Sequence, residues 1–249
     1  ARETKREKWG ADLAASTQRL LSYRPYPPRH SPWLAEVLAQ AARLATGHSA
    51  GQKRLLDWAK APESSSLVTH WSPDPGWTTL FASFLLDSLP NRHKTLSELA
   101  RTYLPGRGAV EQVFRTENPA AFDVIFSNFV GYLFRHEGAP LPLTLAEGSA
   151  SSLRFPAVGN ALSLPSIPAE VSGQIPPYSL LTIQLPAVLP PTAVVEVDTL
   201  ATQPCGSAGT VLWKPVTPKK IVVYSVGCEQ TGPGGNLQFR LRLLDKPLL

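Results

Sequence analysis

The chain changes character near residue 139, and this change constrains its fold more than any other feature of the sequence. Before that point, apolar residues recur every three or four positions, which is typical of helices that pack on one face. After it, residues 140–249 carry 15 of the 25 prolines but only 13 charged residues, and short β-rich runs alternate with turns. This predicts an α+β protein with a helical domain over residues 1–139 and an antiparallel β-sandwich domain over residues 140–249.

The helical part predicts seven helices. Leu13, Thr17, Leu20 and Leu21 recur at helical spacing, and Pro25 ends this first helix. The other expected helices cover residues 33–46, 51–60, 76–89, 94–103, 108–116 and 120–135. The last of them carries a broad apolar stripe, which predicts that it faces the core.

The second part contains five runs with the composition of β-strands. They cover residues 180–185, 193–197, 210–213, 221–226 and 237–243. Their spacing of roughly ten to fifteen residues and the Gly and Pro residues between them favour an antiparallel sandwich. Arg240 and Arg242 alternate with apolar residues, so the last strand is expected to have one face in solvent.

The two cysteines, Cys205 and Cys228, lie 23 residues apart on either side of two apolar runs. If those runs pair as a hairpin, the two sulfurs meet at its open end. We favour a disulfide, which indicates an oxidising, extracytoplasmic location, over two buried free thiols. The chain contains no methionine and begins at Ala1, so we interpret this end as processed or truncated.

Charge and motif content exclude several classes of function. The net charge is +5, and the basic residues near the start are interleaved with acidic ones and form no Gly/Arg repeat, so no nucleic-acid partner is expected. No apolar run reaches the roughly 18–20 residues of a transmembrane helix. The sequence contains no phosphate-binding loop, GxGxxG or calcium-loop motif, and it predicts no cofactor.

Four segments, in order, resemble motifs of a known family. Residues 33–40 (WLAEVLAQ) resemble a "WLNEG" helix, and residues 62–71 (PESSSLVTHW) resemble a "P-[DE]-x-S-L-x-x-W" loop. Residues 76–87 and 122–134 are similar to two later helices of the same family, the second with the pattern "F-x-x-L-F-x-x-W". These are motifs of the gluzincin-type zinc metallopeptidases, and in particular of the secreted bacterial ones that carry a C-terminal β-sandwich.

The resemblance implies a zinc site, but this chain lacks its ligands. The family binds zinc with two histidines of an HExxH helix and with the glutamate of the "WLNEG" helix, which here is Glu36. The usual spacing places Ala15 at the first histidine, Ser16 at the general base and Arg19 at the second histidine. Alanine has no donor atom, and arginine is a permanent cation that would repel Zn²⁺. The resemblance therefore implies a peptidase scaffold with no catalytic residue and no metal.

Two interpretations of Glu36 stay open at this point. It complements the dipole of its own helix, or it forms an ion pair with Arg19 in the vacated metal site.

We therefore expect a secreted or cell-surface pseudo-peptidase that serves as a structural or binding subunit for a protein partner in an extracellular assembly. One alternative is the downstream piece of an active zinc metallopeptidase, which requires a different register. Another is a carbohydrate- or cell-wall-binding protein in which Trp213 and Tyr178 line an exposed sheet face. Our preferred interpretation instead places Trp213 in the core.

Overall fold

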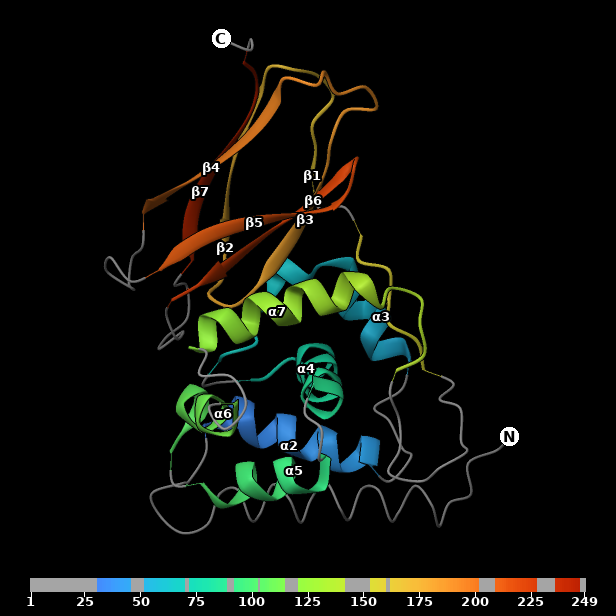
Figure 1. Cartoon of the computed structure of the whole chain (residues 1–249), viewed down its shortest axis with the longest axis vertical. Helices are drawn as coiled ribbons and strands as arrows, with labels where there is room; N and C mark the ends of the chain where they lie inside the picture. Colours follow the sequence, from blue (N-terminus) through green and yellow to red (C-terminus); the bar gives the residue numbers. More distant parts are fainter. Residues whose placement is uncertain are drawn as a thin grey trace. The chain divides into compact units, whose positions relative to one another are not determined.

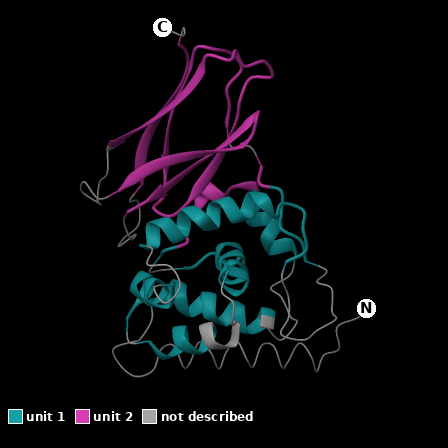
Figure 2. Cartoon of the chain, in the orientation of Figure 1, with its two compact units in different colours: residues 1–59, 68–157 teal, residues 60–67, 158–249 magenta. Residues whose placement is uncertain are grey.

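The chain is seen here in a computed structural model, which describes residues 31–45, 52–69, 72–88, 92–102, 104–114, 121–141, 153–159, 162–201, 209–227 and 236–246. These residues form α-helices and two β-sheets, so the α+β class is confirmed. The chain divides into two compact units (Figure 2). The helical unit is Ala1–Ala59 with Val68–Ala157, and the β unit is Lys60–Leu67 with Val158–Leu249.

Six predicted helices are confirmed to within two residues at each end. They are α2 (Pro32–Ala45), α3 (Gln52–Lys60), α4 (Pro75–Ser88), α5 (Arg92–Arg101), α6 (Gly106–Phe114) and α7 (Phe122–Arg135), and a short 3-10 helix, η1 (Pro62–Ser64), follows α3. The helix predicted around Leu13 lies outside the described residues. None of the described helices has both the length and the apolar character that crossing a bilayer requires.

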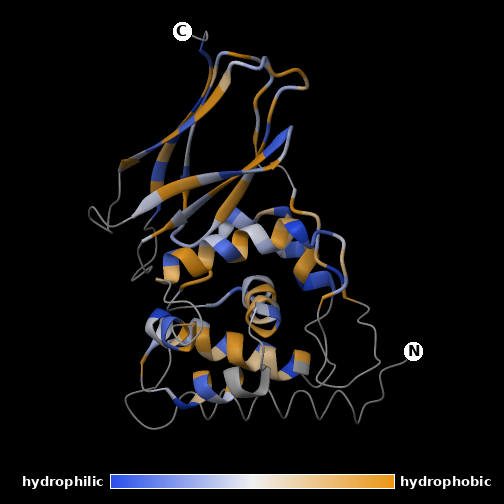
Figure 3. Cartoon of the chain, viewed as in Figure 1, coloured by the Kyte–Doolittle hydropathy of each residue, from blue (hydrophilic) through white to orange (hydrophobic). Residues whose placement is uncertain are grey.

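The helical unit is built around α4. In Figure 1 this helix lies between α2 and α7, and in Figure 3 it is strongly apolar. Every residue from Gly76 to Leu86 is buried, so α4 has no solvent-facing stripe and is a central helix rather than an amphipathic one. Phe81 of α4 contacts Phe129 of α7, with ring centroids 5.0 Å apart, and Trp33 of α2, at 6.2 Å. The predicted apolar stripe of α7 is buried, as expected.

A capped turn and a close contact fix the start of α4. The Asp74 carboxylate accepts hydrogen bonds from the backbone N–H groups of Gly76, at 2.7 Å, and Trp77, at 3.3 Å, which satisfies donors that a helix start leaves unpaired. Pro75 occupies the first helical position, where its missing N–H costs nothing. A Cβ atom at Gly76 would lie only 2.3 Å from the Cβ of Trp58. Only glycine therefore lets α3 approach α4 at this point.

The β unit contains two sheets. Its strands are β1 (Leu162–Ser163), β2 (Ala169–Ile175), β3 (Leu180–Gln184), β4 (Ala193–Ala201), β5 (Thr210–Thr217), β6 (Lys220–Val226) and β7 (Leu237–Asp245). One sheet has the order β1-β3-β6-β5 and the other β2-β7-β4. Buried residues of both sheets, such as Ile183 and Val223 from the first and Phe239 and Leu241 from the second, form one apolar cluster.

The strands differ from the sequence prediction in four places, one of which is β4, which continues to Ala201 rather than ending at residue 197. β1 and β2 were not predicted, and β1 pairs with β3 in parallel, whereas the other described pairs are antiparallel. β2 alternates half-buried and exposed residues around Gly173, which gives it little hydrophobic signal. β5 continues through Pro215 to Thr217, because it is an edge strand, where a missing backbone donor is tolerated.

Gly173 is required by the ring that covers it. It lies opposite Phe239 in the β2–β7 register, and a Cβ atom on Gly173 would lie 2.9 Å from two carbons of that buried ring.

A segment between two helices belongs to the β unit. Lys60–Leu67, which connects α3 to α4, is held by buried serine hydroxyls. Ser66 Oγ donates a hydrogen bond to the Pro177 carbonyl, and Ser179 Oγ donates one to the Pro62 carbonyl at 2.9 Å. Each serine satisfies a buried carbonyl from the other stretch of chain, so the two stretches depend on each other.

Candidate functional site

Of the four residues that the family resemblance would place at a former zinc site, Glu36 is the one that the structure describes. It lies in the second turn of α2 and is half-buried. Its Oε1 accepts a hydrogen bond of 2.7 Å from Nε2 of the buried Gln40, one turn further along the same helix. Ala15, Ser16 and Arg19 lie outside the described residues. The structure therefore places the Glu36 carboxylate against an amide of its own helix.

The structure shows no candidate metal centre in the part of the chain that it describes. Within those ranges, no three His, Cys, Asp or Glu residues come together in a way that could hold a metal ion. Cys205 and Cys228 lie outside the same ranges, so the disulfide stays a prediction.

Most of the residues that carry the family resemblance have a packing role in this chain. Trp33 is fully buried, and its ring lies 5.6 Å from that of Phe122, centroid to centroid. Gly76 makes room for Trp58, as described above. The loop that begins at Pro62 docks into the β unit through Ser66.

The two aromatic residues of the carbohydrate alternative have different environments. Tyr178 is 0% exposed, and its hydroxyl accepts a hydrogen bond from the backbone N–H of Gly227 at 3.2 Å, so it lines no exposed face. Trp213 is 37% exposed on the edge strand β5, next to the 38% exposed Leu212. The expectation that Trp213 belongs to the core is therefore wrong, because an edge strand leaves one flank of its inward residues uncovered.

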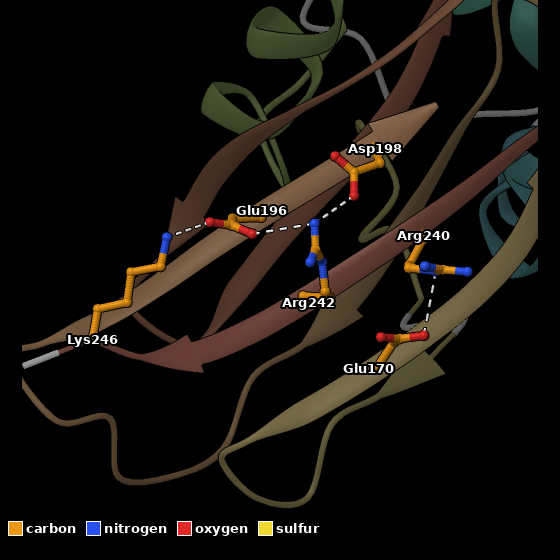
Figure 4. A network of polar contacts seen from close by, with 6 residues as sticks. All are labelled: Glu170, Glu196, Asp198, Arg240, Arg242 and Lys246. Carbon is orange, nitrogen blue, oxygen red and sulfur yellow. Dashed lines mark hydrogen bonds and ion pairs between the residues drawn. The ribbon is translucent and has the colours of Figure 1, made fainter. Parts of the chain in front are cut away.

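The outer face of the three-stranded sheet carries a network of ion pairs (Figure 4). On β7, the Arg242 guanidinium lies 2.7 Å from Asp198 Oδ2 and 3.4 Å from Glu196 Oε2, both on β4. Glu196 Oε1 also accepts a hydrogen bond of 2.5 Å from Lys246 Nζ. This hydrogen bond and the nearby cations hold the pKa of Glu196 below its ordinary value of 4.5.

A second pair extends the same face toward the other edge of the sheet. Arg240 of β7 lies 3.3 Å from Glu170 of β2. The central strand is therefore basic on this face, and both flanking strands are acidic. Sequence reasoning predicted the solvent face of β7 from its alternating arginines. It missed the matching acids of β4, although the Glu196-Val197-Asp198 spacing carries the same two-residue signal.

A shallow pocket of about 460 Å³ opens at one end of the β unit. Among the described residues, Asp245 is the only charged one that lines it, and the carboxylate accepts a hydrogen bond from the Thr192 hydroxyl. The apolar part of the lining comes from two connecting loops and consists mainly of Pro165, Ile167, Pro186, Val188 and Pro190.

No protein-family model, curated protein or solved structure matches this chain. Its own residues are therefore the basis for assigning a function.

Proposed function

We propose that the chain is a non-catalytic binding subunit, secreted or displayed at the cell surface, with a helical scaffold like that of the zinc metallopeptidases and a C-terminal β-sandwich. The observation that carries the proposal is the environment of Glu36. The carboxylate that would complete a zinc site accepts a hydrogen bond from Gln40 of its own helix. The sandwich is supported by the single apolar cluster that the two sheets share.

The donor set does not fit a catalytic zinc ion. Zinc sites of this kind use three protein ligands with nitrogen, oxygen or sulfur donors. When the chain is aligned with the HExxH motif of that family, Ala15 offers a methyl group and Arg19 a fixed positive charge at the two histidine positions. Glu36 would therefore be the single ligand. We therefore derive no hydrolytic step, and we assign the scaffold a role in binding a protein partner.

The proposal is tested by rebuilding the site. Purified protein should contain no stoichiometric zinc and should show no chelator-sensitive peptidase activity. The variant Ala15→His, Ser16→Glu, Arg19→His restores HExxH in the proposed register, so it should take up one equivalent of zinc and melt at a higher temperature when zinc is added. The matched control, Ala14→His, Ala15→Glu, Gln18→His, moves the same motif by one residue, which turns it by about 100° around the helix axis.

The outcomes separate the alternatives. Stoichiometric zinc in the unmodified protein would support the active-peptidase alternative and refute the pseudo-peptidase. Equal zinc uptake by the two rebuilt variants would refute the register.

The carbohydrate-binding alternative retains one favourable observation, the partly exposed Trp213. If the alternative is correct, oligosaccharides should quench tryptophan fluorescence, and Trp213→Ala should abolish the effect. Quenching that persists in this variant, or no quenching at all, would exclude this strand as the binding face.

A further inference from the structure

β4 is the longest edge strand among the described residues of the two sheets. It spans nine residues and pairs through its backbone only with β7 in the part of the chain that the structure describes. Of the other edge strands, β1 has two residues, β2 contains Gly173 and β5 contains Pro215. A long edge without proline exposes a row of backbone donors and acceptors that a further strand can use.

The register identifies which backbone groups of β4 point away from β7. The N–H of Lys246 donates to the carbonyl of Thr192 at 3.2 Å, which makes these two opposed residues a hydrogen-bonded pair. Hydrogen-bonded and non-hydrogen-bonded pairs alternate along an antiparallel ladder. The N–H and C=O groups of Val195 and Val197 therefore face the outer edge of the sheet, together with the C=O group of Ala193. The N–H of Ala193 already donates to the Pro190 carbonyl at 3.0 Å.

The two faces of this edge differ in character. Val195 and Val197 pack against the apolar cluster of the β unit but are only half-buried. Glu196 and Asp198 lie on the opposite face and are both acidic. β7, the strand that β4 already accepts as a neighbour, places Arg242 beside these two carboxylates. β4 thus selects a neighbour with apolar residues on one face and basic residues on the other.

The far end of the edge is closed. The N–H of Val211 on β5 donates to Thr199 Oγ1 at 2.8 Å, and the β4–β7 register shifts after Thr199. The available edge therefore runs from Ala193 to Asp198, which matches a short extended segment of a partner.

We propose that β4 binds an extended segment of a partner protein by strand addition, and that this segment alternates apolar residues with Lys or Arg. Backbone hydrogen bonds to the Ala193 carbonyl and to both groups of Val195 and Val197 supply affinity, while Glu196 and Asp198 select the basic residues. A second copy of this chain is a poorer occupant, because two paired β4 strands would bring acidic residues on one face against each other. The proposal does not depend on whether the helical unit is a degenerate peptidase.

The first test uses a synthetic peptide as the probe. An acetylated and amidated heptapeptide with the sequence of Leu237–Leu243, Leu-Gln-Phe-Arg-Leu-Arg-Leu, reproduces the strand that β4 already accepts. Its control replaces both arginines by glutamate. The basic peptide should bind at least about tenfold more tightly, with a difference that shrinks at high salt. NMR shifts on binding should centre on the amides of Val195 and Val197.

Backbone methylation tests the pairing without changing the protein. One version of the basic peptide is N-methylated at its second, fourth and sixth residues, and the other at its third and fifth. In a strand addition only one of these sets faces β4, so one version should lose binding and the other keep it. Equal effects of the two sets, or no binding of the unmodified basic peptide at millimolar concentration, would overturn the proposal.

A protein variant tests the charge selection. The double variant Glu196→Gln, Asp198→Asn should remove the preference for the basic peptide, whereas Glu170→Gln, on the other edge of the same sheet, should retain it. The melting temperature of each variant verifies that it is folded. Concentration-dependent dimerisation that shifts the amides of Val195 and Val197 would instead identify a second copy as the occupant and refute the partner segment.

Discussion

The contact between Gly76 and Trp58 gives the sharpest test of the helical unit. A Cβ atom at Gly76 would lie 2.3 Å from Trp58 Cβ and 2.8 Å from its Cγ, whereas ordinary contacts begin at 3.4 Å. A rotamer change cannot relieve the shorter contact, because the Cβ of Trp58 is fixed by its backbone. Gly76→Ala therefore forces α3 and α4 apart by about 1 Å.

The expected magnitude follows from two opposing effects. Overpacking of this kind costs about 1–3 kcal/mol, and replacing glycine by alanine in a helix returns at most about 1 kcal/mol. The net loss should therefore be about 1–2 kcal/mol, which for a protein of this size lowers Tm by roughly 2–8 °C.

Gly131 provides the matched control. It lies within α7, and a Cβ atom there would meet no other atom within 4 Å. Gly131→Ala should therefore raise Tm by about 1–4 °C through helix propensity alone. Thermal unfolding of both variants, followed by circular dichroism, checks the pair. If Gly76→Ala melts at or above the temperature of the unmodified protein, the close approach of α3 to α4 is refuted.

Three further variants test the β unit. Ser66→Ala leaves the buried Pro177 carbonyl without its donor, so chemical denaturation should show that the free energy of unfolding falls by about 1–3 kcal/mol. Ser64→Ala, at an exposed serine of the same segment, should change it by less than about 0.5 kcal/mol, and equal losses would contradict the docking of this segment. Glu196→Gln should have a lower Tm than the unmodified protein at neutral pH, and because the folded-state pKa of Glu196 is lowered, the difference in Tm should disappear as the pH falls below 4.5. A difference in Tm that is independent of pH would contradict the ion pairs. Gly173→Val should lower Tm because its side chain meets the Phe239 ring, and Phe239→Leu should recover part of the loss in that background; no recovery would mean that the ring is not the obstacle.

Periodic burial made much of the fold predictable. The helices follow from apolar residues at helical spacing, and α7 is the clearest case, because its whole stripe is buried. β4, β6 and β7 follow from β-branched and alternating residues. β2 could not be predicted in this way, because Gly173 depends on a ring from another strand. The continuation of β5 through Pro215 depends on its position at a sheet edge, which is a tertiary property.

The candidate site was less accessible to sequence reasoning. The motif spacing assigned Glu36 to a ligand position of the family that the sequence resembles. Whether Gln40 donates a hydrogen bond to its carboxylate depends on the rotamers that the packing around α2 allows. The pattern of apolar residues also could not predict the hydrogen bonds of Ser66 and Ser179, because serine does not contribute to that pattern. The ion pairs of Glu196 and Asp198 could not be predicted either, because they depend on the strand register that places both residues beside Arg242.

The assignment of Lys60–Leu67 to the β unit limits how this protein can be divided and how it can be synthesised. The chain passes between the two units three times, so a fragment that begins at residue 158 would lack Lys60–Leu67 and leave the Ser179 hydroxyl without its acceptor. On the ribosome, this octapeptide emerges long before the strands that receive it. Maturation of the β unit must therefore wait until those strands have been made, and transplanting it into another protein requires two pieces of chain.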